Sequence, residues 1–300
     1  MHGVPESKQC VRCGRFRRNA SVGRLRMRIH DLIFRITSFF ALMLSTLALF
    51  SAGAVANQSE VDVWEAFIKP SHFGQTEMLD GAGIIELKTP YRSEDAAFTP
   101  ISINAQIPQT SERYIETLHL FVDRNPEPHV GAFHMTPALG RADLALRVRV
   151  EQYTNVRAVA VLNTGEHYLV TNFVKAQGGC SAPAGSDYQR AMARIGKMKF
   201  RTVGEPNPDQ TVVAQFNLAH PNVTGMQKDQ RTQLIRPAHF VKEVRISLNG
   251  EHILTAETGI SISEDPSYRF FIRPDAEGEV TAEVVDSKGM AWTETFDVQI

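Results

Sequence analysis

The stretch ADLALRVRVE, which spans residues 142–151, alternates apolar and polar side chains with a period of two. Every second position from Leu144 is apolar, and the opposite face carries Ala145, Arg147, Arg149 and Glu151. Successive side chains of a β-strand point to opposite faces of the sheet. The stretch therefore predicts a strand with one face buried and the other in contact with water, as in an antiparallel sheet.

Shorter runs of the same kind lie on both sides of this stretch. Strands are predicted at residues 84–87, 101–103, 118–122, 156–162 and 168–175, each bounded by turn-forming residues. The last two are predicted to pair through the turn Asn163-Thr164-Gly165-Glu166. One short amphipathic helix is predicted over residues 61–68, ending toward Pro70. Short strands at regular spacing with so little helix predict an antiparallel β-sandwich and argue against a parallel α/β fold.

Strand signals resume at Met198 and continue to the end of the chain. Alternating runs cover residues 212–218, 244–248, 268–272, 280–284 and 296–300, and Asn249-Gly250 is a strong hairpin signal. Residues 186–195 are predicted to form a short linker helix capped by Ser186. A second sandwich of about seven strands follows. The predicted fold is therefore all-β, with two antiparallel β-sandwich domains in tandem.

The first 56 residues have the layout of a secretory signal peptide. Basic residues that include Arg24, Arg26, Arg28 and Arg35 precede an apolar run over residues 39–50, and Ala54-Val55-Ala56 provides an A-x-A cleavage site. The charge-free run over residues 36–58 is also long enough to cross a membrane as an uncleaved anchor. The small and polar end of that run favours cleavage after Ala56, so secretion is predicted.

The charge of the mature chain differs from that of the whole chain. The 300 residues contain 32 Lys and Arg and 33 Asp and Glu; cleavage removes nine basic and two acidic residues and leaves 23 against 31, a net charge of −8. Nucleic-acid phosphates require clustered Lys and Arg. The acidic balance therefore argues against a nucleic-acid partner, and it weakly favours partners with basic surfaces.

Cysteine usage singles out one residue. Cys10 and Cys13 lie in the predicted signal, so Cys180 is the only cysteine of the mature chain and has no partner for an internal disulfide. A lone thiol in an oxidising compartment indicates intermolecular pairing or modification. Because Gly178 and Gly179 precede it and lack side chains, they are predicted to act as a hinge. A buried and inert cysteine is the alternative, but the polar, small neighbours favour an accessible and reactive thiol.

No catalytic or cofactor-binding motif accompanies the thiol. Gly81-Ala82-Gly83 lacks the third glycine of a dinucleotide loop. The histidines are scattered and lack the tight spacing of a zinc site, as at His129, His134, His220 and His239. A Cys-His nucleophilic pair with His119 or His167 as the base stays open, since such residues meet in space. We therefore predict no cofactor, no metal and no catalytic machinery.

Both halves of the chain resemble known sulfur-oxidation proteins. The first half is similar to SoxY through the segment FVDRNPEP at residues 121–128, the Arg147-Val148-Arg149 strand and the closing Gly178-Gly179-Cys180. The second half is similar to SoxZ through the loop at residues 220–229, Asn249-Gly250 and the segment at residues 265–270. The departure from the family is that Gly-Gly-Cys continues into Ser181-Ala182-Pro183, so the cysteine segment is tethered at both ends.

This resemblance implies a fold and a function. It implies two immunoglobulin-like sandwiches, a SoxY-like domain at residues 57–180 and a SoxZ-like domain at residues 197–300, joined by a linker at residues 181–196. It also implies a periplasmic carrier on which Cys180 holds a sulfur-containing intermediate, with Gly178 and Gly179 as the hinge of its arm. The fused order resembles the type associated with quinoprotein dehydrogenases, whose proteins would be its partners. A thiol-transfer enzyme and a non-catalytic assembly module are the alternatives.

Overall fold

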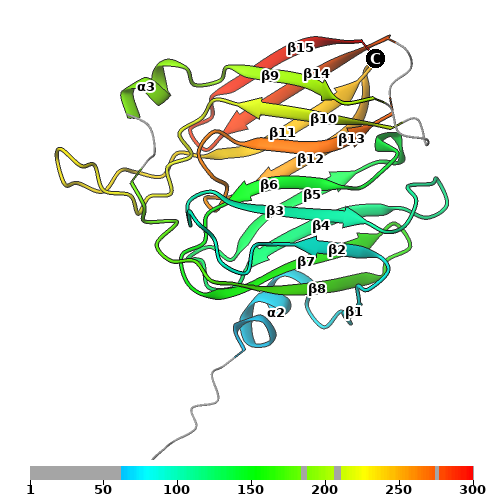
Figure 1. Cartoon of the computed structure of the whole chain (residues 1–300), viewed down its shortest axis with the longest axis horizontal. Helices are drawn as coiled ribbons and strands as arrows, with labels where there is room; N and C mark the ends of the chain where they lie inside the picture. Colours follow the sequence, from blue (N-terminus) through cyan, green and yellow to red (C-terminus); the bar gives the residue numbers. More distant parts are fainter. Residues whose placement is uncertain (1–61, 184–187, 206–210, 274–276, 300) are drawn as a thin grey trace, which may run out of the picture. The chain divides into compact units, whose positions relative to one another are not determined.

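Two β-sheets pack face to face in the computed structural model, which describes residues 62–183, 188–205, 211–273 and 277–299 (Figure 1). Within these residues, the larger sheet has nine strands and the smaller has six. The larger sheet runs in the order β1 (Leu79–Asp80), β8 (His167–Val174), β7 (Thr154–Leu162), β4 (Ile115–Val122), β5 (His129–Met135), β12 (Glu251–Thr258), β11 (Val241–Leu248), β14 (Glu277–Asp286) and β15 (Ala291–Gln299). The smaller runs in the order β2 (Ile85–Lys88), β3 (Thr99–Ala105), β6 (Leu144–Val148), β13 (Ser267–Ile272), β10 (Val212–Leu218) and β9 (Met198–Val203).

Neighbouring strands pair antiparallel, apart from the short β1, which runs parallel to β8. The hairpin β7–β8 forms through the predicted turn, and β11–β12 forms at Asn249-Gly250, where both residues have the positive φ that such a turn requires. The prediction of an all-β fold built from antiparallel sandwiches is therefore confirmed.

The two halves of the chain share both sheets. β5 of the first half pairs with β12 of the second, with Met135 opposite Leu254, and β6 pairs with β13, with Leu144 opposite Phe270. One core of buried apolar side chains extends through both halves, and residues Val61–Ile300 form one compact unit. The shared sheets explain how side chains of the second half reach the first. The predicted boundaries at residues 57, 180 and 197 stay a prediction.

A short helical segment packs on the outer face of the larger sheet. A π-helical turn, η1 (Trp64–Ile68), continues into α2 (Lys69–Phe73), so the predicted helix does not end at Pro70. Proline is tolerated in a first helical turn because its missing N–H would have no partner there. Trp64 and Ile68 are buried against Phe121 and Val159 of the sheet.

The remaining helical elements are short. A 3-10 turn, η2 (Pro137–Leu139), connects β5 to β6, and α3 (Tyr188–Ala193) occupies the predicted linker. The predicted cap Ser186 and the predicted signal peptide lie outside the described residues. No helix in the described ranges is long and apolar enough to cross a membrane.

Candidate functional site around Cys180

The segment that carries Cys180 leaves β8 and lies along the end of β6. The Gly178 N–H donates to the Glu151 carbonyl at 2.8 Å, and the Gly179 N–H donates to the Val150 carbonyl at 3.0 Å. The Ala182 N–H closes a turn onto the Gly178 carbonyl at 2.8 Å. In this structure the segment is therefore held against the sheet by backbone hydrogen bonds.

The two glycines before the thiol meet different requirements. Gly178 has φ +79°, a conformation that residues with side chains adopt at a cost. At Gly179 a Cβ atom would lie 2.1 Å from the Ala96 carbonyl oxygen and 2.7 Å from the Val150 nitrogen. Glycine at this position allows the backbone to approach its neighbours closely. The predicted hinge role stays a prediction, since this structure records one position of the segment.

Gly179→Ala is expected to detach the cysteine segment. The added methyl meets backbone atoms that cannot move aside, and overpacking of this kind costs about 1–3 kcal/mol. Cys180 is then expected to react with dithiobis(nitrobenzoate) about tenfold faster than in the wild type. Gly165→Ala is the control for general destabilisation, because the φ of +97° at Gly165 strains any side chain, whereas an added Cβ there meets no atom within 4 Å in the β7–β8 turn. Equal rates in the wild type and Gly179→Ala would contradict this account.

The Glu151 carboxylate caps the turn at the thiol. Its Oε2 accepts the Cys180 N–H at 2.8 Å and the Ser181 N–H at 3.1 Å, and its Oε1 accepts the Ser181 hydroxyl at 3.0 Å. Hydrogen bonds to an ionised acceptor are roughly twice as strong as neutral ones. Glu151 is thus the main side-chain anchor of the segment within the first half.

The thiol itself is fully buried, with none of the Cys180 surface exposed. The prediction of an accessible thiol is therefore wrong for this conformation. Burial, reinforced by the negative charge of Glu151 and opposed by Arg149, raises the pKa of Cys180 to about 12. At neutral pH roughly one thiol in a hundred thousand is then ionised, so the closed segment holds Cys180 in an unreactive form.

Arg149 lies beside this thiol and is also buried, with 1% of its surface exposed. The alternating pattern of residues 142–151 predicted that the Arg149 side chain would face water, and that prediction is wrong. The strand β6 ends at Val148, and the residues that follow lie against the cysteine segment. The Arg149 Nη1 donates to the Gly179 carbonyl at 3.1 Å. The site therefore combines a thiol, a carboxylate and a guanidinium.

The second half of the chain completes the enclosure. The Thr224 hydroxyl donates to the Cys180 carbonyl at 2.7 Å, and the Gln227 side-chain amide donates to the Ala182 carbonyl at 2.8 Å. The Thr224 N–H in turn donates to the Gln227 side-chain oxygen at 3.2 Å. The loop at residues 220–228 thus binds the backbone on both sides of the buried thiol.

The family comparisons match the two halves separately. Residues 69–180 match the model of the family described as sulfur oxidation protein SoxY, so the match ends on Cys180 itself. Residues 200–297 match the model of the family described as sulphur oxidation protein SoxZ. The chain carries a SoxY domain followed by a SoxZ domain. Thr224 and Gln227 are therefore contacts that the SoxZ domain makes to the cysteine segment of the SoxY domain.

Similar solved structures cover either about a third or about 70% of the chain. The sulfur carrier protein SoxY from Chlorobium limicola f thiosulfatophilum is 24% identical, with a TM-score of 0.31 over 36% of this chain and 88% of that one. A superoxide reductase from Ignicoccus hospitalis is 11% identical, with a TM-score of 0.28 over 31% and 78%. Fibronectin(III)-like modules of Clostridium thermocellum CbhA are 12% identical, with a TM-score of 0.21 over 72% and 94%. No curated protein sequence matches the chain significantly.

A buried polar network supports the SoxZ loop that contacts Cys180. His220, His239 and Asp286 lie far apart in the sequence, yet their ligand-type atoms lie within 4.8 Å of one another. The His239 Nε2 is 2.6 Å from the Asp286 Oδ2. The Asn222 N–H donates to the His220 Nδ1 at 3.1 Å, so in the neutral ring the Nε2 carries the hydrogen and is not a free metal ligand. This arrangement fits a hydrogen-bonded support for the loop.

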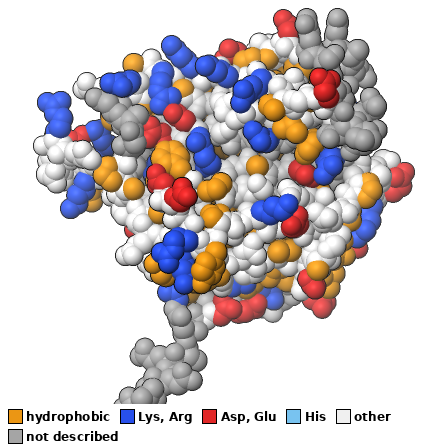
Figure 2. Space-filling view, in the orientation of Figure 1, with side chains coloured by type: hydrophobic (Ala, Val, Ile, Leu, Met, Phe, Trp, Pro, Cys, Tyr) orange, Lys and Arg blue, Asp and Glu red, His pale blue; other side chains and the backbone are white. Residues whose placement is uncertain are grey.

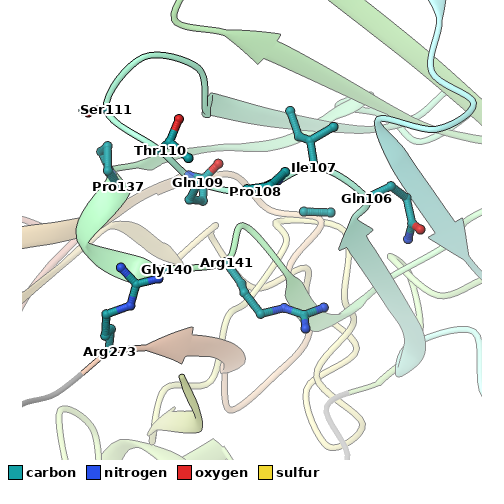
Figure 3. A pocket seen from close by; sticks show the side chains of 11 residues that line it. Gln106, Ile107, Pro108, Gln109, Thr110, Ser111, Pro137, Gly140, Arg141 and Arg273 are labelled. Carbon is teal, nitrogen blue, oxygen red and sulfur yellow. The ribbon is translucent and has the colours of Figure 1, made fainter. Parts of the chain in front are cut away.

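A separate pocket of about 640 Å³ lies at the other end of β3 (Figure 3). Ala96, before β3, contacts the cysteine segment, whereas the pocket begins at Ala105, where β3 ends. Its lining includes Arg141 of the SoxY domain and Arg273 of the SoxZ domain. The pocket therefore does not belong to the thiol site.

Sequence reasoning found the thiol and its glycines but missed the groups that enclose them. Glu151 and Arg149 were assigned to the wet face of a strand, and the loop at residues 220–229 was recognised only as polar. The resemblance to SoxY and SoxZ offered a signal for Arg149 and for this loop, since both lie in the segments that carry the resemblance. The bases considered for Cys180, His119 and His167, lie instead in an aromatic cluster around Phe73.

Proposed function

We propose that the protein is a periplasmic carrier that holds a sulfur-containing intermediate covalently on Cys180 and presents it to partner enzymes. The observation that carries this proposal is the place of Cys180. It is the final residue of the SoxY match and the only cysteine among the described residues, and both domains bind its segment. The proposed partners are periplasmic sulfur-metabolism proteins or proteins associated with a quinoprotein dehydrogenase.

In this proposal the buried position of the cysteine segment is the state in which the carrier stores its cargo. A sulfur adduct on a fully buried thiol is shielded from water and from other thiols, because an attacking group needs access to the sulfur. Presentation requires the segment to leave the sheet, which breaks its hydrogen bonds to Arg149, Val150, Glu151, Thr224 and Gln227 and exposes the Cys180 side chain. The closed state then protects the cargo, and an open state delivers it.

The partner supplies the chemistry in this proposal. Cleavage or oxidation of the adduct would take place in the partner's active site, so Cys180 needs only to be loaded and released. The face shown in Figure 2 carries basic and acidic side chains interspersed, without a large patch of one sign. A partner that meets this face would therefore recognise shape and hydrogen bonds more than net charge.

The test is an intact mass of the mature protein, purified without reductant from the cell that produces it. We expect an adduct that contains sulfur, that disappears on reduction and that is absent from Cys180→Ser. The same spectrum checks the predicted cleavage after Ala56. A bare thiol under every condition that induces the protein would contradict the carrier function.

A non-catalytic assembly module of a quinoprotein dehydrogenase system is the second candidate. The complete burial of Cys180 and its raised pKa favour this reading, because both suit a thiol that only packs. In that case Cys180→Ser would leave cellular function intact. Loss of function in Cys180→Ser at an unchanged protein level separates the carrier from the module.

A further inference from the structure

The pocket at the end of β3 is built by both halves of the chain (Figure 3). Its walls are the β3–β4 loop, the turn η2 with the two residues that follow it, and the residue that follows β13. The strands nearest to these walls in sequence, β6 and β13, pair with each other across the two domains. The volume of about 640 Å³ lies within the range of about 300–1,000 Å³ that is usual for small-molecule sites.

Two arginines, one from each domain, give this pocket its charge. Arg141 belongs to the SoxY domain and Arg273 follows the last SoxZ strand of the smaller sheet, and among the described residues no carboxylate lines the pocket. Arg273 has no ion-pair partner in the described part of the chain. The Arg141 Nη2 donates to the Asp143 Oδ2 at 3.2 Å. This bond uses one of the five N–H donors of Arg141 and leaves the others for a ligand.

The space beside the Arg273 guanidinium depends on Gly140. This residue has φ +76°, and a Cβ atom there would lie 3.2 Å from the Arg273 Nη2 and 2.6 Å from the Thr211 Cγ2. The guanidinium of Arg141 lies over the Phe271 ring, with its Cζ 4.7 Å from the ring centroid. Figure 3 shows the two guanidinium groups well apart, with the β3–β4 loop across from both. A single small inorganic anion would therefore meet one arginine or the other.

We propose that this pocket binds a small organic dianion of the dicarboxylate class, with one carboxylate at Arg141 and the other at Arg273. The parallel N–H donors of a guanidinium match the two oxygens of one carboxylate. The apolar body between the carboxylates would lie against the lining side chains of Ile107, Pro108 and Pro137. Removal of that apolar surface from water favours binding.

This binding site is separate from the carrier function. None of its lining residues is among those that bind the cysteine segment. A ligand that reaches both arginines would connect the SoxY domain to the SoxZ domain at the end of the β6–β13 pairing. Because it binds only the folded chain, it would also stabilise the protein against unfolding.

The test uses the purified mature chain and the unbranched dicarboxylic acids from malonate to suberate. Each acid is compared with the monocarboxylic acid of the same chain length, and sulfate serves as a small dianion without an apolar body. Isothermal titration calorimetry in Tris chloride at about pH 7.5, where every carboxylate is ionised, gives the stoichiometry and the Kd. The salt concentration is kept low because salt screens exposed charges.

We expect one member of the series to bind one-to-one and at least about tenfold more tightly than its monocarboxylate and than sulfate, because only the dicarboxylate pairs with both guanidinium groups. Arg273→Met should abolish this difference. Arg141→Lys, which keeps the charge but not the paired donors, should reduce it. Arg269→Met is the matched control: Arg269 is an exposed residue of β13 outside the lining, and its variant should bind as the wild type does.

Two results would overturn the proposal. One is a wild type in which no dicarboxylate binds more tightly than its monocarboxylate or than sulfate, and this comparison requires no variant to fold. The other is a preference for the dicarboxylate that persists in Arg273→Met, since the acid would then bind elsewhere. Thermal midpoints show whether the variants are folded. Cys180→Ser should bind the acid as the wild type does, so failure of this site and failure of the carrier function are detected separately.

Discussion

Replacing Glu151 by alanine is expected to raise the rate at which Cys180 reacts with dithiobis(nitrobenzoate) by about a hundredfold at neutral pH. The carboxylate accepts the N–H groups of Cys180 and Ser181 and the Ser181 hydroxyl, and each such charged hydrogen bond contributes about 1.5–3 kcal/mol. Without them the closed position of the segment loses its main anchor. The thiol then spends more time exposed, where its pKa returns toward that of a free cysteine.

The variant Glu151→Gln separates the effect of the Glu151 charge on the thiol pKa from the effect of the hydrogen bonds that anchor the segment. The glutamine oxygen can still accept the two N–H groups, but the negative charge that helps to raise the pKa of Cys180 is removed. We expect the pKa of the thiol to fall and the rate to rise by about tenfold, less than for alanine. The rates are followed from the released thionitrobenzoate across a range of pH. Glu116→Ala, an exposed carboxylate of β4, is the control and should leave the rate unchanged.

The order of these variants decides what keeps the thiol unreactive. If Glu151→Gln and Glu151→Ala are equally fast, the charge dominates and the anchoring is unimportant. If both react as slowly as the wild type, the burial of Cys180 does not depend on the Glu151 side chain, and the backbone hydrogen bonds, Arg149 and the SoxZ contacts hold the segment. Thr224→Val would then be the variant that releases it.

The fold was largely predictable because most strands bury one face. β10 follows the alternating pattern along its whole length, and its apolar positions form the core. β5 was missed, since four consecutive residues, Val130–Phe133, are buried and give no alternation. A strand enclosed on both faces reads as a continuous apolar run. The cause is its position, because β5 lies in the interior of the larger sheet and pairs with β12 of the other half.

Of the site, only Cys180 and the two glycines before it were predictable from the sequence. A lone cysteine after two glycines is visible in the sequence, but its burial depends on a loop that lies about forty residues further along the chain. The sheets that both halves share bring this loop next to the cysteine. Arg149 and Glu151 follow the alternation of β6 in sequence, yet the strand ends before them, so their faces are set by the cysteine segment. Period-two reasoning fails where a strand ends, and functional groups often lie there.

Stability is expected to fall steeply when the pH drops from about 6.5 to about 4. Burial, together with neighbouring histidine charges, lowers the pKa of His119 to about 3 and those of His129 and His220 to about 4. In the unfolded chain these groups titrate near 6.5. Below that pH the unfolded state binds more protons than the folded state, so acid favours unfolding. The stability that neutral histidines provide is complete above pH 6.5 and is lost as the pH falls toward 4.

The size of the effect follows from the number of groups. Each histidine contributes at most about 1.4 kcal/mol per pH unit in this window, so these three give a slope of up to about 4 kcal/mol per unit near pH 5. Burial also lowers the pKa values of His72 and His252, which add to the slope in the same direction. Asp123 acts in the opposite direction, because burial raises the pKa of its carboxyl despite its bond to Arg157. Urea unfolding of the mature protein at several pH values between 7.5 and 4.5 measures the slope.

The variant His220→Asn measures how much His220, in the polar network under the SoxZ loop, contributes to the pH dependence of the unfolding free energy. The asparagine oxygen can take the place of the His220 Nδ1 and accept the Asn222 N–H, so the loop keeps its support while the titrating ring is removed. We expect the slope near pH 5 to fall by at most about 1.4 kcal/mol per pH unit, the contribution of one histidine. His119→Asn should remove a second share independently, because His119 and His220 lie in different domains and share no partner. A stability that stays flat between pH 7 and 5 would mean that these histidines are as accessible to protons in the folded protein as in the unfolded chain, which their enclosure by Phe73, Phe121 and Trp292 argues against.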